Sequence, residues 1–487
     1  MKIHNLINRR ITKFCKQTMA LTLALLFVMP SISYSILNGY KSVKAADEDG
    51  NEYTPATAGT SLMACFPDEN FARYVYEKVL YHDNWDTEGS DYRLTDIDVD
   101  IIQNFTDIRA GGRSIADITG IQNFTELTRV NIGLNDIDSI PNNLPSKITY
   151  LDLGNNNLSS LPATLPPGLA ELYLGGNQFQ SLPDNLPSSL TILDVGNNQL
   201  TSLPELPESL TILSVGNNQF QSLPDNLPSS LTKLTVTSNQ LQSLPALPAS
   251  LTDLQADGNQ LTSLPALPAS LTELRVYNNQ IKALPALPVS LTILEVYNNK
   301  LQSLPENLPE NLTTIYVDNN QLTSLPALPE SLTILQAGNN QLTSLPALPE
   351  SLTNLYADNN QLQSLPALPE SLTYLDVSNN QFTSLPALPA SLTELRVYNN
   401  QLQSLPENLP ASLTYLDLGD NNLSSLPATL PPGLTELYLG NNQLKELDLS
   451  NLENLRSANF SGQTPQFEYI AIEDGNYKIL DVPTKNL

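Results

Sequence analysis

The segment LTYLDVSNNQFTSLPALP, residues 372–389, decides the fold because close copies of it fill most of the chain. The copy that follows begins LTELRVYNNQLQSLP at Leu392. Repetition at a fixed short period predicts one elongated stack of units rather than several globular domains. Sixteen clear units share the template, and they begin at residues 127, 148, 169, 190, 210, 231, 251, 271, 291, 312, 332, 352, 372, 392, 413 and 434.

Two weaker units flank the clear ones. They begin at Phe105 and Leu455, and Arg113 and Gln463 stand where the other units have an asparagine. Atypical terminal units are usual in stacked arrays, because the end units face a different environment. We therefore predict about eighteen units within residues 105–466.

Each unit has two halves of different character. The first half, T-x-L-x-V, alternates apolar and polar residues and predicts a short strand with its Leu and Val inside. The second half places two prolines within four or five residues, as in S-L-P-A-L-P. Proline breaks helices and lacks an N–H group, so we expect an extended, polyproline II-like return. Neighbouring strands must then be parallel and in register.

The ninth place of each clear unit is an asparagine inside the expected core. An unpaired buried amide would cost about 1–3 kcal/mol. We therefore expect a ladder in which each asparagine side chain bonds the turn backbone of its own and the next unit. Its role is structural rather than catalytic. The asparagines are Asn135, Asn156, Asn177, Asn198, Asn218, Asn239, Asn259, Asn279, Asn299, Asn320, Asn340, Asn360, Asn380, Asn400, Asn421 and Asn442.

Residues 1–46 have the features of a secretory signal peptide. Basic residues come first, then the apolar run MALTLALLFVM at residues 19–29, then a small-residue cleavage site around Ala45. An uncleaved membrane anchor is the alternative, but the run is shorter than the roughly 20 residues of a spanning helix. We expect export with cleavage and no membrane insertion afterwards.

The charge of the exported part restricts its partners. The chain carries 23 Lys and Arg against 50 Asp and Glu, for a formal net charge of −27. Residues 1–46 hold seven of the basic residues and none of the acidic ones, so 16 basic residues remain against 50 acidic. Such a chain repels nucleic acid and anionic membranes. Neutral or cationic proteins are the expected partners, together with weak binding of divalent cations.

Residues 47–104 are expected to form a mobile lead-in followed by an N-terminal cap. Nothing in residues 47–59 calls for burial, whereas residues 67–80 predict a helix with Phe71, Val75 and Val79 on one face. That helix is placed to cover the open end of the stack. At the other end, residues 467–487 leave the repeat register and predict a C-terminal cap or extension.

The acidic segment around Gly89 invites comparison with a calcium-binding loop. With Gly89 at the sixth place of such a loop, Asp91 falls where an apolar residue belongs and Thr95 where a bidentate Glu belongs. A solvated acidic loop is the preferred interpretation. We predict no metal site and no cofactor.

The core L-x-x-L-x-[VL]-x-x-N-x-L resembles the leucine-rich repeat superfamily, and the half S-L-P-x-L-P-x-S-L is similar to its short bacterial class, that of YopM-like and IpaH-like effectors. The segments FPDENFARYV and IADITGIQNFTELTRVNI look like the caps of exported, internalin-like proteins. The resemblance covers about residues 105–463. It implies a leucine-rich repeat solenoid: a right-handed curved coil with a concave parallel β-sheet, an extended convex side and a small helical cap.

Two features of these relatives are not matched. Ubiquitin-ligase relatives carry a cysteine-containing catalytic domain after the repeats, and no cysteine follows Cys65 here. Wall-anchored relatives end in LPxTG, whereas the nearest strings, at residues 161–165 and 426–430, lie within repeats. We expect a secreted protein, or one held at the cell surface without a sortase anchor.

An enzymatic role has little support in the sequence. The predicted exported part contains one histidine, His82, one cysteine, Cys65, and one tryptophan, Trp85. All three precede the repeats. Hydroxyl or thiol triads therefore cannot be built on the repeats. A carboxylate pair for glycoside hydrolysis is a minor alternative on so acidic a surface. We predict a protein that is not an enzyme.

The third, fifth and seventh places of each unit vary and should face the concave side. Tyr and Arg gather there, and these residue types concentrate binding energy. Pairing along the sheet, of Arg275 with Glu295 and of Arg396 with Asp376 and Asp417, is the alternative role. The predicted partner-binding residues form two clusters: Arg275, Tyr277, Glu295, Tyr297 and Tyr316, and then Tyr374, Arg396, Tyr398, Tyr415 and Tyr438.

Two functions follow as hypotheses. The first is an exported recognition protein that binds another protein, host proteins included, through its concave face. The second is a structural envelope or matrix protein that self-associates or binds divalent cations through its acidic surface. The sequence favours the first, because the variation between units is concentrated on one face.

Overall fold

The computed structural model describes residues 53–445, 447, 449 and 451–464. The predicted signal peptide and C-terminal extension lie outside these residues. In the described part of the chain, no helix is both long and apolar enough to cross a membrane.

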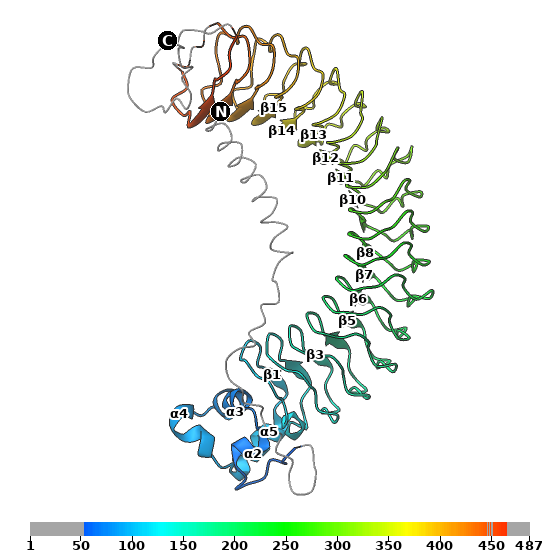
Figure 1. Cartoon of the computed structure of the whole chain (residues 1–487), viewed down its shortest axis with the longest axis vertical. Coiled ribbons are helices and arrows are strands. Elements are labelled where there is room, and N and C mark those ends of the chain that lie inside the picture. The colour runs from blue at the N-terminus through cyan, green and yellow to red at the C-terminus, as the bar shows by residue number, and fades with distance from the viewer. Residues whose placement is uncertain (1–52, 446, 448, 450, 465–487) are drawn as a thin grey trace. The chain divides into compact units, whose positions relative to one another are not determined.

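One parallel sheet runs through the repeats (Figure 1). Each described strand has three residues, which occupy the third to fifth places of a unit, and pairs in register with the strand of the next unit; Leu274, for example, lies opposite Leu294. The strands are β1 (Asp107–Arg109), β2 (Arg129–Asn131), β3 (Tyr150–Asp152), β4 (Glu171–Tyr173), β5 (Ile192–Asp194), β6 (Ile212–Ser214), β7 (Lys233–Thr235), β8 (Asp253–Gln255), β9 (Glu273–Arg275), β10 (Ile293–Glu295), β11 (Thr314–Tyr316), β12 (Ile334–Gln336), β13 (Asn354–Tyr356), β14 (Tyr374–Asp376), β15 (Glu394–Arg396), β16 (Tyr415–Asp417), β17 (Glu436–Tyr438) and β18 (Ser457–Asn459).

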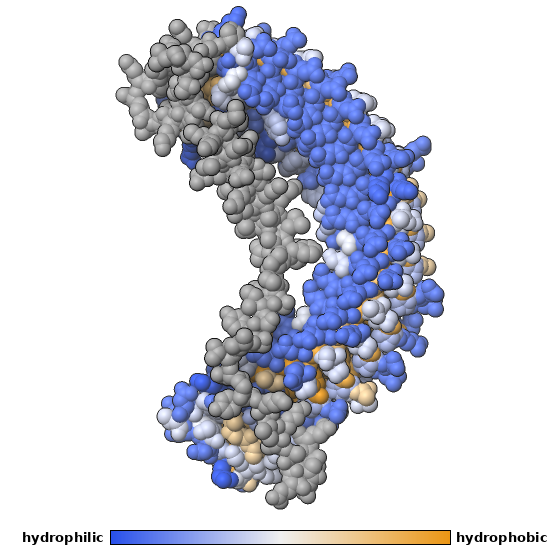
Figure 2. Space-filling model, in the orientation of Figure 1, coloured by the Kyte–Doolittle hydropathy of each residue, from blue (hydrophilic) through white to orange (hydrophobic). Residues whose placement is uncertain are grey.

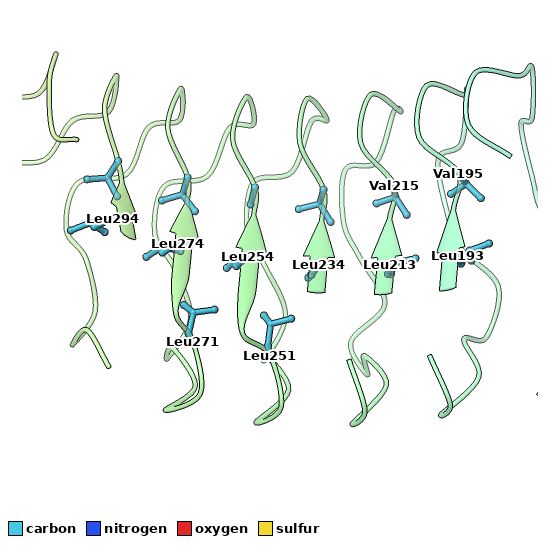
Figure 3. Packing of buried hydrophobic residues seen from close by; sticks show 14 of the residues in the cluster. Leu193, Val195, Leu213, Val215, Leu234, Leu251, Leu254, Leu271, Leu274 and Leu294 are labelled. Atoms are coloured by element: carbon cyan, nitrogen blue, oxygen red, sulfur yellow. The ribbon is translucent and has the colours of Figure 1, made fainter. Parts of the chain in front are cut away.

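The predicted solenoid is confirmed. The sheet lines the inner side of the curved stack, and the proline-containing segments return along the outer side without forming a helix in the described residues (Figure 1). Equivalent leucines and valines of successive units lie side by side in rows (Figure 3). Leu274 and Val276 are fully buried, and the residues at the same two places of the other clear units are at most 1% exposed, whether they are Leu, Val, Ile or Ala. Each unit thus buries its apolar side chains against both neighbours.

The eighth place of each clear unit adopts a left-handed backbone conformation. This place follows the strand by three residues, where the chain turns away from the sheet. Asn, Asp and Gly tolerate that conformation better than other residues. Asn278 has φ 53°, Asn319 has φ 53° and Gly258 has φ 65°, whereas Leu134 is the one bulky apolar residue there. The first asparagine of the N-N pair therefore shapes the turn.

The second asparagine forms the ladder, with one correction to its direction. Asn279 Nδ2 donates to Val276 O of its own unit at 3.0 Å and to Ala256 O of the preceding unit at 3.0 Å. Its Oδ1 accepts the Leu261 amide, also of the preceding unit, at 2.9 Å. The repeat pattern predicted contacts with the next unit, and that prediction was wrong. The side chain points back toward the N-terminal side of the stack.

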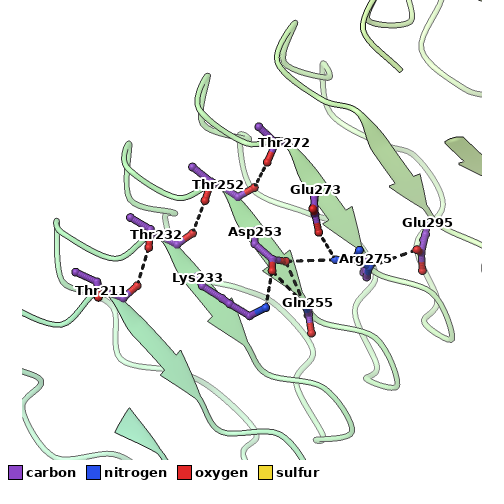
Figure 4. A network of polar contacts seen from close by, with 10 residues as sticks. All are labelled: Thr211, Thr232, Lys233, Thr252, Asp253, Gln255, Thr272, Glu273, Arg275 and Glu295. Carbon is purple, nitrogen blue, oxygen red and sulfur yellow. Dashed lines mark hydrogen bonds and ion pairs between the residues drawn. The ribbon is translucent and has the colours of Figure 1, made fainter. Parts of the chain in front are cut away.

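Hydroxyl groups form two further ladders. Thr272 Oγ1 donates to Thr252 O at 3.0 Å, and the same contact recurs between successive units (Figure 4). On the convex turn, Ser270 Oγ donates to Leu251 O at 2.7 Å. Both ladders supply donors to carbonyl groups that lie just before the three-residue strands begin.

Short helices form the N-terminal cap. Phe71, Val75 and Val79 are fully buried, as predicted. The predicted single helix from residue 67 to 80 is nevertheless wrong in two respects: it begins at Glu69 with Asp68 as N-cap, and its second half is a π-helix. The elements are α2 (Leu62–Cys65), α3 (Glu69–Tyr74), η1 (Val75–Val79), α4 (Trp85–Glu88), η2 (Gly89–Asp91), α5 (Asp96–Asn104) and, just before β2, η3 (Ile121–Asn123).

The cap closes the open edge of the sheet. Tyr74 Oη accepts the Arg109 amide of β1 at 2.8 Å, so this edge N–H group has a partner. Asp68 caps α3 through Phe71 N and accepts the Ala116 amide at 2.8 Å. These bonds fasten the cap to the first unit.

The lead-in is attached to the cap over part of its length. Ala56 is 5% exposed, and its N–H group donates to Asn123 Oδ1 at 2.8 Å. Cys65 is buried beside Pro55 O. Residues 54–56 are thus held against the cap by contacts with Asn123 and Cys65 that the sequence pattern does not reveal.

Candidate protein-binding surface

All ten predicted partner-binding residues lie along the sheet side of the repeats, and all are partly buried. Side chains at the third and fifth places project from the strands, and those at the seventh place follow two residues later. Figure 2 shows one flank of the repeats, which is covered mostly by hydrophilic residues. The ten predicted residues themselves combine charged groups with tyrosine rings.

Arg275 of the first cluster is surrounded by carboxylates. Its Nη1 lies 2.6 Å from Glu273 and 3.5 Å from Asp253, and its Nε lies 3.3 Å from Glu295 (Figure 4). Lys233 extends the network through Asp253 at 2.7 Å. The predicted pairing of Arg275 with Glu295 is confirmed, and the structure adds Asp253 and Glu273, which the sequence pattern did not reveal.

Tyr277 and Tyr297 form a stacked pair in the same cluster. Their ring centroids are 4.3 Å apart and the rings are 8° from parallel. Burial raises the pKa of Tyr277 to about 12, above the ordinary value of a tyrosine. Tyr316 lies on β11 opposite Glu295 in the strand register, beside this pair rather than within it. Four of the five predicted residues of this cluster therefore form two direct contacts, the ion pair Arg275–Glu295 and the stacked pair Tyr277–Tyr297.

Arg396 organises the second cluster. Its guanidinium lies 5.3 Å from the ring centroid of Tyr374 and 4.6 Å from that of Tyr415, so rings of both neighbouring strands flank it. Tyr415 continues to Tyr438, with ring centroids 5.6 Å apart. Tyr398 stands two residues beyond β15, at the seventh place. Cation–π contacts of this kind contribute about 0.5–2 kcal/mol each.

The predicted pairing of Arg396 with Asp376 and Asp417 was wrong. Asp376 Oδ1 accepts the Ser378 amide at 3.0 Å, and Asp417 Oδ1 accepts the Gly419 amide at 3.1 Å. Both carboxylates thus bond the turn that follows their own strand. In the described part of the chain, the ion pair of Arg396 is with Glu394 of the same strand, at 3.5 Å.

Two further aromatic groups were missed. The rings of Tyr356 and Tyr374 are tilted by 31°, with their centroids 4.5 Å apart, and the guanidinium carbon of Arg129 lies 3.4 Å from the ring centroid of Tyr150. Tyr356 and Tyr374 occupy a fifth and a third place of adjacent units, so the contact is diagonal across the sheet. Searching for Tyr and Arg at diagonal as well as equal places identifies such groups from sequence.

Several carboxylates on this face are shielded from water. Burial raises the pKa of Asp257, Asp318 and Asp417 to about 6 in each case. Asp318 Oδ1 also accepts the Gly338 amide at 3.1 Å. Burial disfavours the charged form, and neighbouring carboxylates such as Asp358 add to that effect for Asp318. These groups change charge just below neutral pH.

The chemistry-bearing residues of the cap serve its structure. His82 Nε2 lies 2.9 Å from Tyr92 Oη, which donates to Asp98 Oδ2 at 2.8 Å. Asp98 also accepts the Thr95 amide and completes a capping box at the start of α5. The acidic segment considered for calcium forms α4 and η2, and the described residues hold no group of three or more His, Cys, Asp or Glu arranged to bind a metal. Structural roles within the cap are sufficient to explain the contacts of His82, Tyr92 and Asp98.

Comparison with known proteins agrees with this architecture. The Leucine Rich Repeat family matches residues 147–167, 371–390, 412–432 and 433–455. The structure of YopM, a leucine-rich effector protein from Yersinia pestis, is 42% identical, with a TM-score of 0.56, over 63% of this chain and 88% of that one. YopM from Yersinia enterocolitica WA-314 is 34% identical, with a TM-score of 0.62, over 77% of this chain and 91% of that one. The chain belongs to the leucine-rich repeat family.

The similarity to a second bacterial protein, InlJ, is one of fold alone. The functional domain of InlJ from Listeria monocytogenes is 22% identical, with a TM-score of 0.55, over 83% of this chain and 82% of that one. A sequence search of curated proteins found no significant match. The similarity to YopM and the fold of InlJ agree with the resemblance to bacterial repeat proteins drawn from the sequence.

Proposed function

We propose that this leucine-rich repeat protein is an exported, non-catalytic recognition protein that binds another protein through the concave face of its sheet. The fold is typical of protein–protein interaction domains, and YopM is described as an effector protein. A solenoid suits this role because it presents a long surface whose residues vary without disturbing the core.

The observation that carries the proposal is the set of aromatic contacts on the sheet side. Tyr277 stacks on Tyr297, and Arg396 lies between Tyr374 and Tyr415, with every one of these side chains partly exposed. Tyrosine and arginine held rigidly in place lose little entropy on binding and are enriched at the energetic centres of interfaces. The convex side carries mainly Leu, Pro, Ser and Glu, which offer no comparable anchors.

Capture of a partner by residues 47–487 tests the proposal. Extracellular and cell-surface proteins are incubated with the wild-type chain, with the double variant Tyr297→Ala and Tyr398→Ala, and with the convex control Glu350→Ala and Glu370→Ala. We expect one protein to be retained by the wild type and the control and lost from the tyrosine variant. Equal retention by all three would contradict binding through the concave face.

Light scattering distinguishes the structural alternative. A monodisperse monomer is expected for the recognition protein. Multimers that dissociate when a chelator is added would instead favour a self-associating envelope or matrix protein that binds divalent cations through its acidic surface.

A further inference from the structure

Two identical ten-residue segments place an arginine in the same position on the sheet. LTELRVYNNQ occurs at residues 271–280 and again at 392–401, with Arg275 and Arg396 at the fifth place of each unit. Both side chains extend from the end of a three-residue strand. Any difference between them therefore comes from the neighbouring units.

Carboxylates of the same sheet already pair with the guanidinium of Arg275. Carboxylates of Asp253, Glu273 and Glu295 lie within 3.5 Å of its guanidinium, one on its own strand and one on each adjacent strand. Its side chain is 24% exposed. A partner carboxylate approaching Arg275 would have to displace one of these three groups, so little attraction is left for it.

The neighbours of Arg396 leave most of its donors unused, since its one side-chain hydrogen bond in the described residues runs from Nη2 to Glu394. The carboxylates flanking it at the fifth place, Asp376 and Asp417, accept turn amides, and its ion pair with Glu394 is long at 3.5 Å. Its Nε is buried with no hydrogen-bond partner in the described residues. The side chain is 34% exposed, more than that of Arg275.

Aromatic rings hold this unsatisfied guanidinium in place. Tyr374 and Tyr415 belong to the strands on either side, with ring centroids 5.3 Å and 4.6 Å from the guanidinium carbon. The two rings restrict the rotamers of Arg396 and shield it from water. They do not accept hydrogen bonds from the N–H groups, which point outward in the plane of the guanidinium. A planar fork of N–H donors, fixed and partly desolvated, matches the two oxygens of a carboxylate.

We propose that Arg396 is an anchor for the carboxylate of an Asp or Glu side chain on a protein partner, whereas Arg275 is a structural residue of the sheet. This inference rests on the proposed function and adds the chemistry of one contact. The acidic residues nearby, Glu394 and Asp417 among them, repel a segment with several acids. The partner therefore presents a single acid in an otherwise neutral or basic segment.

A random peptide library displayed on phage is the probe, because ligands can be selected from it before any natural partner is identified. Selection is carried out on residues 47–487 of the wild type, and enriched peptides are synthesised with each acid in turn changed to its amide. Their binding is then measured to Arg396→Gln, to Arg396→Lys and to the matched control Arg275→Gln. Thermal unfolding of each variant reports whether it is folded.

The expected result is a peptide with one required Asp or Glu. Its binding falls about tenfold or more on Arg396→Gln and on amidation of that acid, and the two changes together add little to either alone. Arg396→Lys gives an intermediate loss, because it keeps the charge without the fork. Arg275→Gln leaves binding unchanged.

Two results would overturn the inference. Peptides that compete with one another on the concave face but need no acid, or that are affected equally by Arg275→Gln, contradict the anchor while leaving concave-face recognition in place. Peptides whose binding is unaffected by Tyr297→Ala and Tyr398→Ala, as well as by Arg396→Gln, contradict both the anchor and the proposed function.

Discussion

Asn279 joins its unit to the one before it, because its side-chain oxygen accepts the amide of Leu261 while its nitrogen donates to the carbonyl of Ala256. One side chain thus satisfies two backbone groups of a neighbouring unit. At the C-terminal end, Gln463 makes the same contacts, with Oε1 accepting Leu444 N at 3.0 Å and Nε2 donating to Leu439 O at 2.7 Å. The weak last unit therefore completes the ladder with a longer amide.

Replacing Asn279 by alanine should destabilise the stack. The change leaves the Leu261 amide and the Ala256 carbonyl without their partner in a buried place, at a cost of about 1–3 kcal/mol. Urea denaturation of residues 47–487 checks this, with Gln260→Ala, an exposed residue, as control. Equal denaturation midpoints for the two variants would contradict a stabilising ladder.

Asn319 should tolerate glycine and resist valine. It is exposed and has φ 53°, so a substitution there tests backbone conformation with little change in packing. A β-branched residue in that conformation costs roughly 1–2 kcal/mol, whereas Asn319→Gly should be close to neutral. Thermal unfolding of both variants gives the comparison. The idea fails if valine and glycine have the same effect.

Asp318→Asn should stabilise the protein in a pH-dependent way. Burial raises the pKa of Asp318 from 3.8 to about 6, so the folded state binds more protons than the unfolded state between these values. This carboxyl therefore lowers the free energy of unfolding as pH rises through that window. Asparagine carries no charge and still accepts the Gly338 amide. Its stabilising effect should be full above pH 6 and absent below about pH 4.

Urea denaturation at a series of pH values measures that difference. Asp184→Asn, an exposed aspartate on a convex loop, is the matched control. A stability difference between Asp318→Asn and the wild type that does not change with pH would show that burial of this carboxyl does not control it.

Tyr74→Phe should loosen the junction between cap and sheet. The hydroxyl accepts the Arg109 amide of the edge strand at 2.8 Å, a bond worth about 0.5–1.5 kcal/mol. Hydrogen exchange followed by mass spectrometry should show faster exchange in residues 107–111. Tyr81→Phe is the control, because Tyr81 is 78% exposed. Unaltered exchange in β1 would mean that other contacts close this edge.

The repeat register and the core were predictable because both depend on local pattern. A period of 20 or 21 residues, with Leu at the first and fourth places and prolines in the second half, permits strands in register and excludes helices. Leu271 and Leu274 are fully buried for that reason. The positions of the two clusters on the sheet side could also be predicted, since alternation along each strand shows which side chains project from the concave face of the sheet.

The partners of individual side chains required the tertiary structure. Asp417 is adjacent to Arg396 in register, yet it bonds the Gly419 amide two residues along its own chain. A short contact within one turn needs no ordering of a second long side chain, so it prevails over the ion pair. Sequence spacing specified neighbours here, and backbone geometry decided which neighbours bond.

The sequence by itself determined a stack of leucine-rich units, because each unit repeats the same apolar and turn residues and cannot bury them alone. Only the tertiary structure decided that Asn279 reaches back to the preceding unit, and that Arg275 contacts three carboxylates while Arg396, in an identical segment, has one ion pair at 3.5 Å. The physical reason is that these outcomes depend on side chains some 20 residues away in the chain, which the fold brings within hydrogen-bonding distance.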